Sequence, residues 1–91
     1  MQHQLKIKKC YLIHILEERK TFEIRKNDRD FQSGDTISFL PLDDEEYDIY
    51  GMYPLPLPDF VITYVLEDVD GLSSGYAVLS IEQQDQGENE S

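Results

Sequence analysis

Short stretches of alternating hydrophobic and polar residues recur along the chain and predict a mainly β domain. In residues 4–8, Leu5 and Ile7 lie on one side and lysines on the other, which is the period of a half-buried strand. The same period, or an apolar composition typical of strands, recurs in four more segments: residues 21–25, 36–40, 60–67 and 76–82. Turn-forming residues separate these segments, as in KNDRDFQSGD between the second and third.

The segment TFEIR carries the polar residues that matter most for function. Its alternation leads us to expect Phe22 and Ile24 to face the core. Thr21, Glu23 and Arg25 would then share the solvent side of the strand.

The segment CYLIHILEERK is ambiguous between helix and strand. Leu12 and Leu16 have helical spacing, whereas Ile13 and Ile15 would also suit a strand. We predict a helix over about residues 9–18, because basic residues follow it directly and favour the negative C-terminal end of a helix.

The second half of the chain combines an acidic connection, a long apolar run and a polar tail. Residues 41–59 contain all four prolines, several acids and three tyrosines, so we expect a long surface loop. The run FVITYVLE at 60–67 is expected to be buried on both faces or nearly so. Residues 84–91 are polar and acidic, which predicts a disordered tail after a single domain at 1–83.

These elements amount to about five strands and one early helix, without β-α-β alternation. We therefore predict an α+β fold, mainly β, with a small curved sheet or barrel in one domain of 91 residues. No apolar run approaches the ~20 residues of a membrane-spanning helix, and no signal-peptide pattern is evident. A single cysteine, Cys10, fits a reducing compartment, so we expect a cytoplasmic protein without membrane contact.

Charge is distributed very unevenly along the chain. The net charge is −11, yet all eight lysines and arginines lie within the first 29 residues. The remaining 62 residues hold 15 acids and no basic side chain. The acidic remainder opposes binding to duplex DNA, which needs many phosphate contacts. This charge distribution favours a small pocket for one anionic or polar ligand. The alternative is that the acidic residues only keep a small domain soluble.

The block KKCYLIHILEERKTFEIRKNDRDFQSGDTISFL resembles the signature stretch of ASCH domains, most closely a small branch found in bacteria and their phages. The opening around His3 and the closing GYAVLSI fit the same branch, so the resemblance covers residues 3–82 except the loop at 41–59. It implies a PUA-like pseudobarrel with a helix between the first strands and a cleft beside that helix.

The resemblance also implies a function, because ASCH relatives are thought to bind RNA or nucleotides in that cleft. A few are enzymes, including a ribonuclease and an amidohydrolase that acts on acetylated cytidine. The amidohydrolase has a lysine, a nucleophilic threonine three positions later, and an arginine two further on. Lys20 and Arg25 match the first and third positions, but Glu23 replaces the threonine. Lys20 and Glu23 would be the acid–base pair if this chain were a hydrolase of modified nucleosides.

The favoured hypothesis is an RNA- or nucleotide-binding module. An arginine can hold a phosphate bidentately, a carboxylate can accept from an exocyclic amine, and a tyrosine can stack on a base. The candidate ligand-binding residues are Lys6, Tyr11, Lys20, Thr21, Glu23, Arg25, Asn27 and Arg29. The alternative is that Glu23 forms ordinary ion pairs with Lys20, Arg25 or Arg29 on a solvated strand. Among the other aromatic residues, we expect Phe31 and Tyr64 to belong to the core.

The remaining reactive residues do not form a recognisable centre. His3 and His14 lie 11 positions apart without a Cys-x-x-Cys pair, so we expect no metal ion and no cofactor. Cys10 is expected to be a buried or half-buried thiol. A third hypothesis is a protein-interaction adaptor in which the acidic loop at 41–59 engages a basic partner.

Overall fold

The computed structural model describes residues 1–42 and 56–84. Five strands and one helix follow one another in these residues: β1 (Gln2–Ile7), α1 (Lys9–Leu16), β2 (Phe22–Lys26), β3 (Thr36–Pro41), β4 (Phe60–Glu67) and β5 (Tyr76–Gln83). Most of the predicted acidic loop, and with it the adaptor hypothesis, lies outside the described residues, as does nearly all of the predicted tail. No helix in the described part of the chain is long and apolar enough to cross a membrane.

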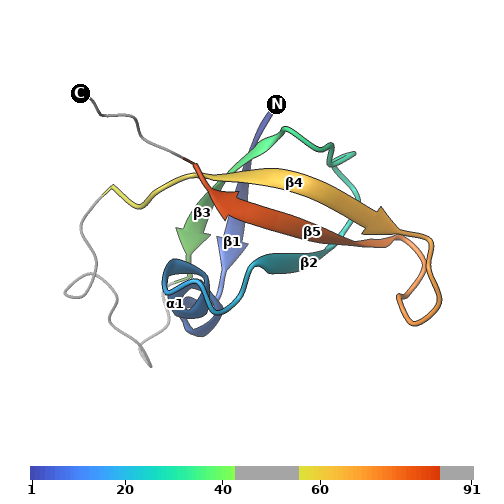
Figure 1. Cartoon of the computed structure of the whole chain (residues 1–91), viewed down its shortest axis with the longest axis horizontal. Helices are drawn as coiled ribbons and strands as arrows, with labels where there is room; N and C mark the ends of the chain where they lie inside the picture. The colour runs from blue at the N-terminus through green and yellow to red at the C-terminus, as the bar shows by residue number, and fades with distance from the viewer. Residues whose placement is uncertain (43–55, 85–91) are drawn as a thin grey trace.

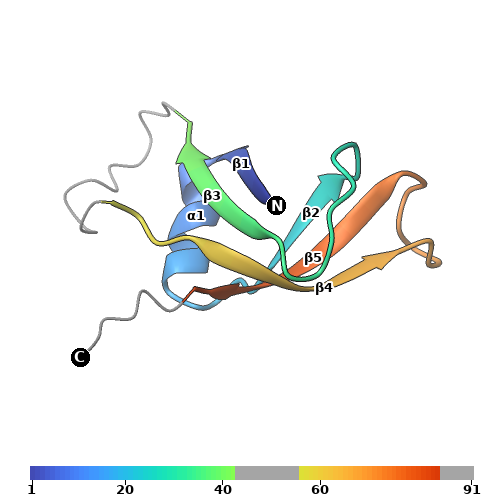
Figure 2. The ribbon, with the colours of Figure 1, turned by 90° about the horizontal axis from the view of Figure 1, so that it is seen from above.

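The strands form one curled sheet in the order β1-β3-β4-β5-β2. β1 pairs with β3 in parallel, and the other neighbours pair in antiparallel fashion. β1 and β2 are therefore the two edge strands, and the curl of the sheet brings them to the same side of the molecule as α1 (Figures 1 and 2). The predicted fold class is confirmed: a mainly β half-barrel with a single short helix.

The hydrophobic core occupies the inside of this half-barrel. Alternate residues of β1 and β3 point inward, as the period of two predicts. Leu12 and Ile15 of α1 pack into the same core, because they lie three positions apart on one helix face. The other buried apolar residues come mostly from the sheet: Leu5, Ile7, Phe31, Ile37, Phe39, Phe60, Ile62, Ala77, Leu79 and Ile81.

The prediction that residues 60–67 are buried on both faces is wrong for the second half of β4. Phe60 and Ile62 are buried, but Tyr64 is 59% exposed and therefore does not belong to the core as expected. An irregularity in the β4–β5 register between Ile62 and Tyr64 turns the tyrosine outward. No second layer among residues 1–42 and 56–84 covers the outer face there, so an apolar strand remains half in water.

The predicted orientation of β2 is also wrong. Phe22 and Ile24 are 42% and 55% exposed, whereas Glu23 is only 5% exposed. The register explains the difference, because Glu23 lies opposite Leu79, which is fully buried on the inner face of β5. Side chains of an antiparallel pair share a face, so Glu23 must point inward and its apolar neighbours outward.

A basic pocket between the two edge strands as the candidate functional site

The gap between β1 and β2 is bridged by arginine side chains. No backbone hydrogen bond joins these two strands in the described structure. The Arg25 guanidinium on β2 donates from Nη2 to the carbonyl oxygen of Lys6 at 2.7 Å. Arg29, just after β2, donates from Nη1 to the carbonyl oxygen of Gln4 at 3.0 Å. These two carbonyl groups lie on the unpaired edge of β1, where no further strand of the described residues accepts or donates hydrogen bonds. Positively charged side chains provide the missing donors.

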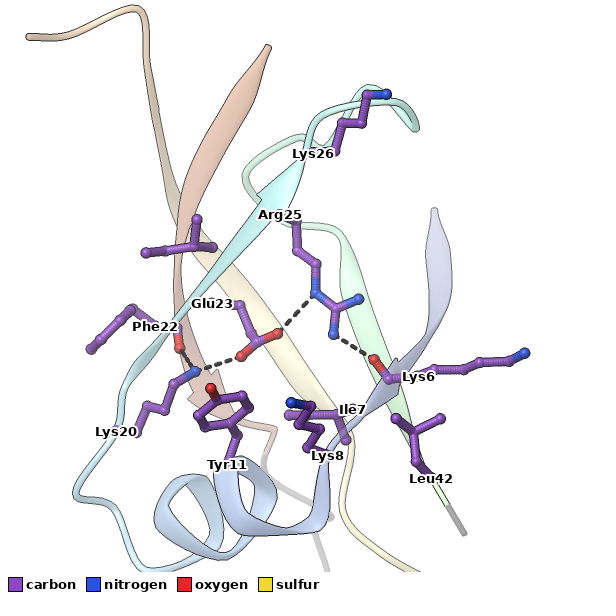
Figure 3. A pocket seen from close by; sticks show the side chains of 11 residues that line it. Lys6, Ile7, Lys8, Tyr11, Lys20, Phe22, Glu23, Arg25, Lys26 and Leu42 are labelled. Carbon is purple, nitrogen blue, oxygen red and sulfur yellow. Dashed lines mark hydrogen bonds and ion pairs between the residues drawn. The ribbon is translucent and has the colours of Figure 1, made fainter. Parts of the chain in front are cut away.

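A pocket of about 500 Å³ opens at this gap, between the end of β1, the start of α1 and β2 (Figure 3). Four lysines, one arginine and one carboxylate line it together with apolar and aromatic side chains. The lining residues are Lys6, Ile7, Lys8, Tyr11, Lys20, Phe22, Glu23, Ile24, Arg25, Lys26 and Leu42. An adjoining hollow shares Lys6 and Arg25 and is also lined by Arg29. A chain of net charge −11 therefore presents a concentrated positive surface at one place.

Glu23 organises the centre of the pocket. One of its carboxylate oxygens accepts from Lys20 Nζ at 2.5 Å, and the other accepts from Arg25 Nε at 2.9 Å. Lys20 also donates to the carbonyl oxygen of Phe22 at 2.6 Å. The buried carboxylate thus holds both cations in place, and charge-assisted bonds of this kind are stronger than neutral ones.

Lys20 is further held by two aromatic rings. Its ammonium lies 4.8 Å from the centroid of the Phe22 ring and 5.6 Å from that of Tyr11. Both distances are within the range of cation–π attraction. Lys20, Tyr11 and Phe22 therefore form one cluster at the side of the pocket nearest α1, as Figure 3 shows.

Lys8 and Tyr11 present an ammonium group and an exposed aromatic ring to the pocket. Lys8 precedes α1 with extended backbone, and its side chain projects into the pocket beside Tyr11 (Figure 3). The Lys8 ammonium has no hydrogen-bond or ion-pair partner in the described part of the chain. Tyr11 is 48% exposed, so its ring can contact a ligand at the pocket mouth.

Most, but not all, of the predicted ligand residues meet in this pocket. Lys6, Tyr11, Lys20, Glu23 and Arg25 line it, and Arg29 lines the adjoining hollow. The two remaining candidates, Thr21 and Asn27, lie elsewhere. Of the three residues that sequence reasoning proposed as partners of Glu23, the structure pairs it with Lys20 and Arg25, but in a buried rather than a solvated setting.

Thr21 faces a different hollow beside Ile81. Asn27 donates from Nδ2 to Glu67 at 2.8 Å and accepts from the Phe31 backbone N–H at 3.1 Å, so it stabilises the turn after β2. Lys8 and Lys26 were missed, although the alternation of residues 4–8 already placed Lys6 and Lys8 on one face.

His3 and Asp35 form a separate buried pair at the start of β1. His3 Nε2 lies 2.9 Å from Asp35 Oδ2, which also accepts from the Gln32 backbone N–H at 3.1 Å. The hydrogen bond to His3 is the main cause that lowers the pKa of Asp35, and burial opposes it. This pair ties β1 to the turn before β3. Among the described residues, no three His, Cys, Asp or Glu side chains are grouped so as to hold a metal ion.

Fold and site together define a small mainly β half-barrel with a basic pocket where its two edge strands approach each other. Residues 2–81 match a family described as a domain of unknown function (DUF3850), and the chain belongs to that family. The match spans all five strands except the end of β5, so the pocket lies within the family domain. A comparison with curated proteins found no match.

Proposed function

We propose that this chain is an RNA- or nucleotide-binding module of the PUA-like ASCH type, acting in the cytoplasm. The observation that carries the proposal is the convergence of Lys8, Lys20, Arg25 and Tyr11 on one pocket of an otherwise acidic chain. A nucleotide needs positive charge for its phosphate and a flat apolar surface for its base, and these residues offer both.

The dimensions and chemistry of the pocket support the proposal. A volume of about 500 Å³ is in the range of small-molecule sites. The ammonium of Lys8 is available for a phosphate, because it has no partner in the described structure. The ring of Tyr11 lies beside it and would contact the base.

Glu23 has a positioning role in this proposal. Since each of its oxygens already accepts from a cation, Glu23 sets the places of Lys20 and Arg25. For the same reason, nothing in this arrangement favours the hydrolase alternative, in which Glu23 would have to exchange a proton. That alternative predicts product formation from N-acylated nucleosides, and Glu23→Gln would abolish it.

The test is an NMR titration of the chain at low salt with nucleosides, nucleoside monophosphates and short single-stranded RNAs. We expect chemical-shift changes to cluster on Lys8, Tyr11 and residues 20–26. Lys8→Ala should weaken binding about tenfold or more, because a hydrogen bond to a charged group contributes roughly 1.5–3 kcal/mol. Lys8 suits this test better than Arg25, whose removal would leave the buried Glu23 with one partner fewer.

The matched control is Arg19→Ala, which removes the same unit of charge outside the pocket. Among the described residues, Arg19 pairs with Glu17 and His14 at an exposed position just after α1. A well-dispersed spectrum without shifts in the pocket for any of these ligands would refute the proposal. Equal losses in Lys8→Ala and Arg19→Ala would show non-specific charge attraction instead of a pocket.

A further inference from the structure

The outer face of the sheet carries a contiguous apolar surface that the proposed pocket alone does not explain. It spans three neighbouring strands and consists of Phe22, Ile24, Tyr64, Leu66, Tyr76 and Val78, here called the outer patch. Five of the six are exposed, from 36% for Leu66 to 59% for Tyr64, and Val78 is half-buried. Contiguous exposed apolar surface of this kind marks an interaction site more often than scattered single residues do.

The strand register places two aromatic residues of the outer patch on either side of a small residue. Ser80 lies opposite Phe22 on one side and opposite Tyr64 on the other. Two strand spacings, roughly 10 Å, therefore separate the backbones of the two aromatic residues. Because Ser80 is small, no bulky side chain of β5 lies between the two residues in this register. The exposed rings of Phe22 and Tyr64 offer flat apolar surfaces on which a nucleic-acid base can stack.

The outer patch is continuous with the basic pocket. Phe22 and Ile24 line the pocket and also belong to the patch, because β2 is an edge strand whose two faces meet at the gap. The Lys20 ammonium lies 4.8 Å from the Phe22 ring centroid, and Lys26 lies opposite Tyr76. A ligand that leaves the pocket across β2 thus meets aromatic rings accompanied by lysines.

We infer that the partner is a single-stranded nucleic acid that occupies the pocket with one nucleotide and continues over β2 onto the outer patch. Bases following the bound nucleotide would stack on Phe22, Tyr64 and Tyr76, while Lys20 and Lys26 contact the phosphates. Alternation of stacking rings and basic side chains is how proteins bind single strands with little sequence preference. This inference rests on the proposed function and extends it from a single nucleotide to a strand.

The test compares a nucleoside monophosphate with single-stranded RNA and DNA hexamers, measured on the same protein by NMR titration. The hexamers should bind the wild-type chain more tightly than the monophosphate does. Tyr64→Ser should weaken hexamer binding about tenfold and leave monophosphate binding unchanged, because Tyr64 lies outside the pocket lining. Tyr64→Phe keeps the ring and serves as the matched control, with hexamer affinity near that of the wild type.

Each outcome assigns success or failure to one of the two proposals. If the monophosphate binds but the hexamers bind no more tightly, or Tyr64→Ser leaves hexamer binding unchanged, the inference fails and the proposed function stands. If neither ligand binds, the proposed function fails and the inference with it. Sedimentation of the same samples tests whether a second copy of the chain binds to the outer patch. A dimer that Tyr64→Ser dissociates would identify the patch as a self-association surface and overturn the inference.

Discussion

Replacing Glu23 by alanine removes the carboxylate that lies between Lys20 and Arg25 at the centre of the pocket. Glu23 is 5% exposed, so the substitution tests whether this double ion pair behaves as a buried or as a surface interaction. Exposed pairs contribute about 0–1 kcal/mol to the free energy of unfolding. Removing one partner of a buried pair costs roughly 3–5 kcal/mol, because a charge is left without compensation.

The structure places Glu23→Ala between these limits. The side chains left without their counter-ion, Lys20 and Arg25, are 18% and 24% exposed and can regain part of their hydration. We therefore expect a loss of about 2–3 kcal/mol in the free energy of unfolding. For a domain of this size that loss lowers the melting temperature by roughly 10–20 °C.

The assay is urea unfolding followed by circular dichroism, at low salt and again at about 1 M salt. Glu82→Ala is the matched control, because Glu82 is an exposed glutamate on the neighbouring strand β5. It should change the free energy of unfolding by less than about 0.5 kcal/mol. The Glu23→Ala loss should persist at high salt, since buried pairs are screened far less than exposed ones.

A loss for Glu23→Ala as small as that for Glu82→Ala would refute the reasoning. It would mean that water compensates the two cations fully and that the pairs are ordinary surface contacts. A loss that disappears at 1 M salt would lead to the same conclusion. Either result would also remove the argument that Glu23 positions Lys20 and Arg25 for a ligand.

Three further predictions concern the scaffold that holds the pocket. The hydrogen bond to His3 keeps the pKa of Asp35 below its ordinary value, so the stabilising contribution of Asp35 is fully present above pH about 4 and is lost as the pH falls through the lowered pKa. Urea midpoints measured between about pH 5 and 2 should therefore fall more steeply for the wild type than for Asp35→Asn. Equal slopes for the two proteins would contradict this prediction. Leu79→Ala should lower the free energy of unfolding by about 2–5 kcal/mol, measured by urea unfolding, because Leu79 is fully buried. A loss below about 1 kcal/mol would show that neighbouring side chains fill the cavity left by the substitution. Gly34→Ala should lower the free energy of unfolding by about 1–2 kcal/mol, although a Cβ meets nothing within 4 Å, because φ is +97° there; an unchanged midpoint would mean that the turn relaxes.

The sequence by itself determined the elements of this protein and their order. Alternation in residues 4–8 and 36–40 is a local signal, and both segments contribute strands in which Leu5, Ile7, Ile37 and Phe39 are buried. The helix appears at Lys9–Leu16, within the predicted residues 9–18. The first 29 residues are also the basic part of the chain, and most residues that line the pocket come from them, including Lys6, Tyr11, Lys20, Glu23 and Arg25.

Only the tertiary structure decided which way β2 faces and what its polar residues do. Alternation identifies two faces of a strand, but it cannot say which one is inside when a carboxylate is paired as Glu23 is. That choice depends on the register with β5, which sets Glu23 beside Leu79 and turns Phe22 outward. The position of Tyr64 likewise depends on an irregularity in strand pairing that local sequence does not reveal. Pairing between distant segments sets these positions, because the cost of burying a charge depends on partners that only the folded chain supplies.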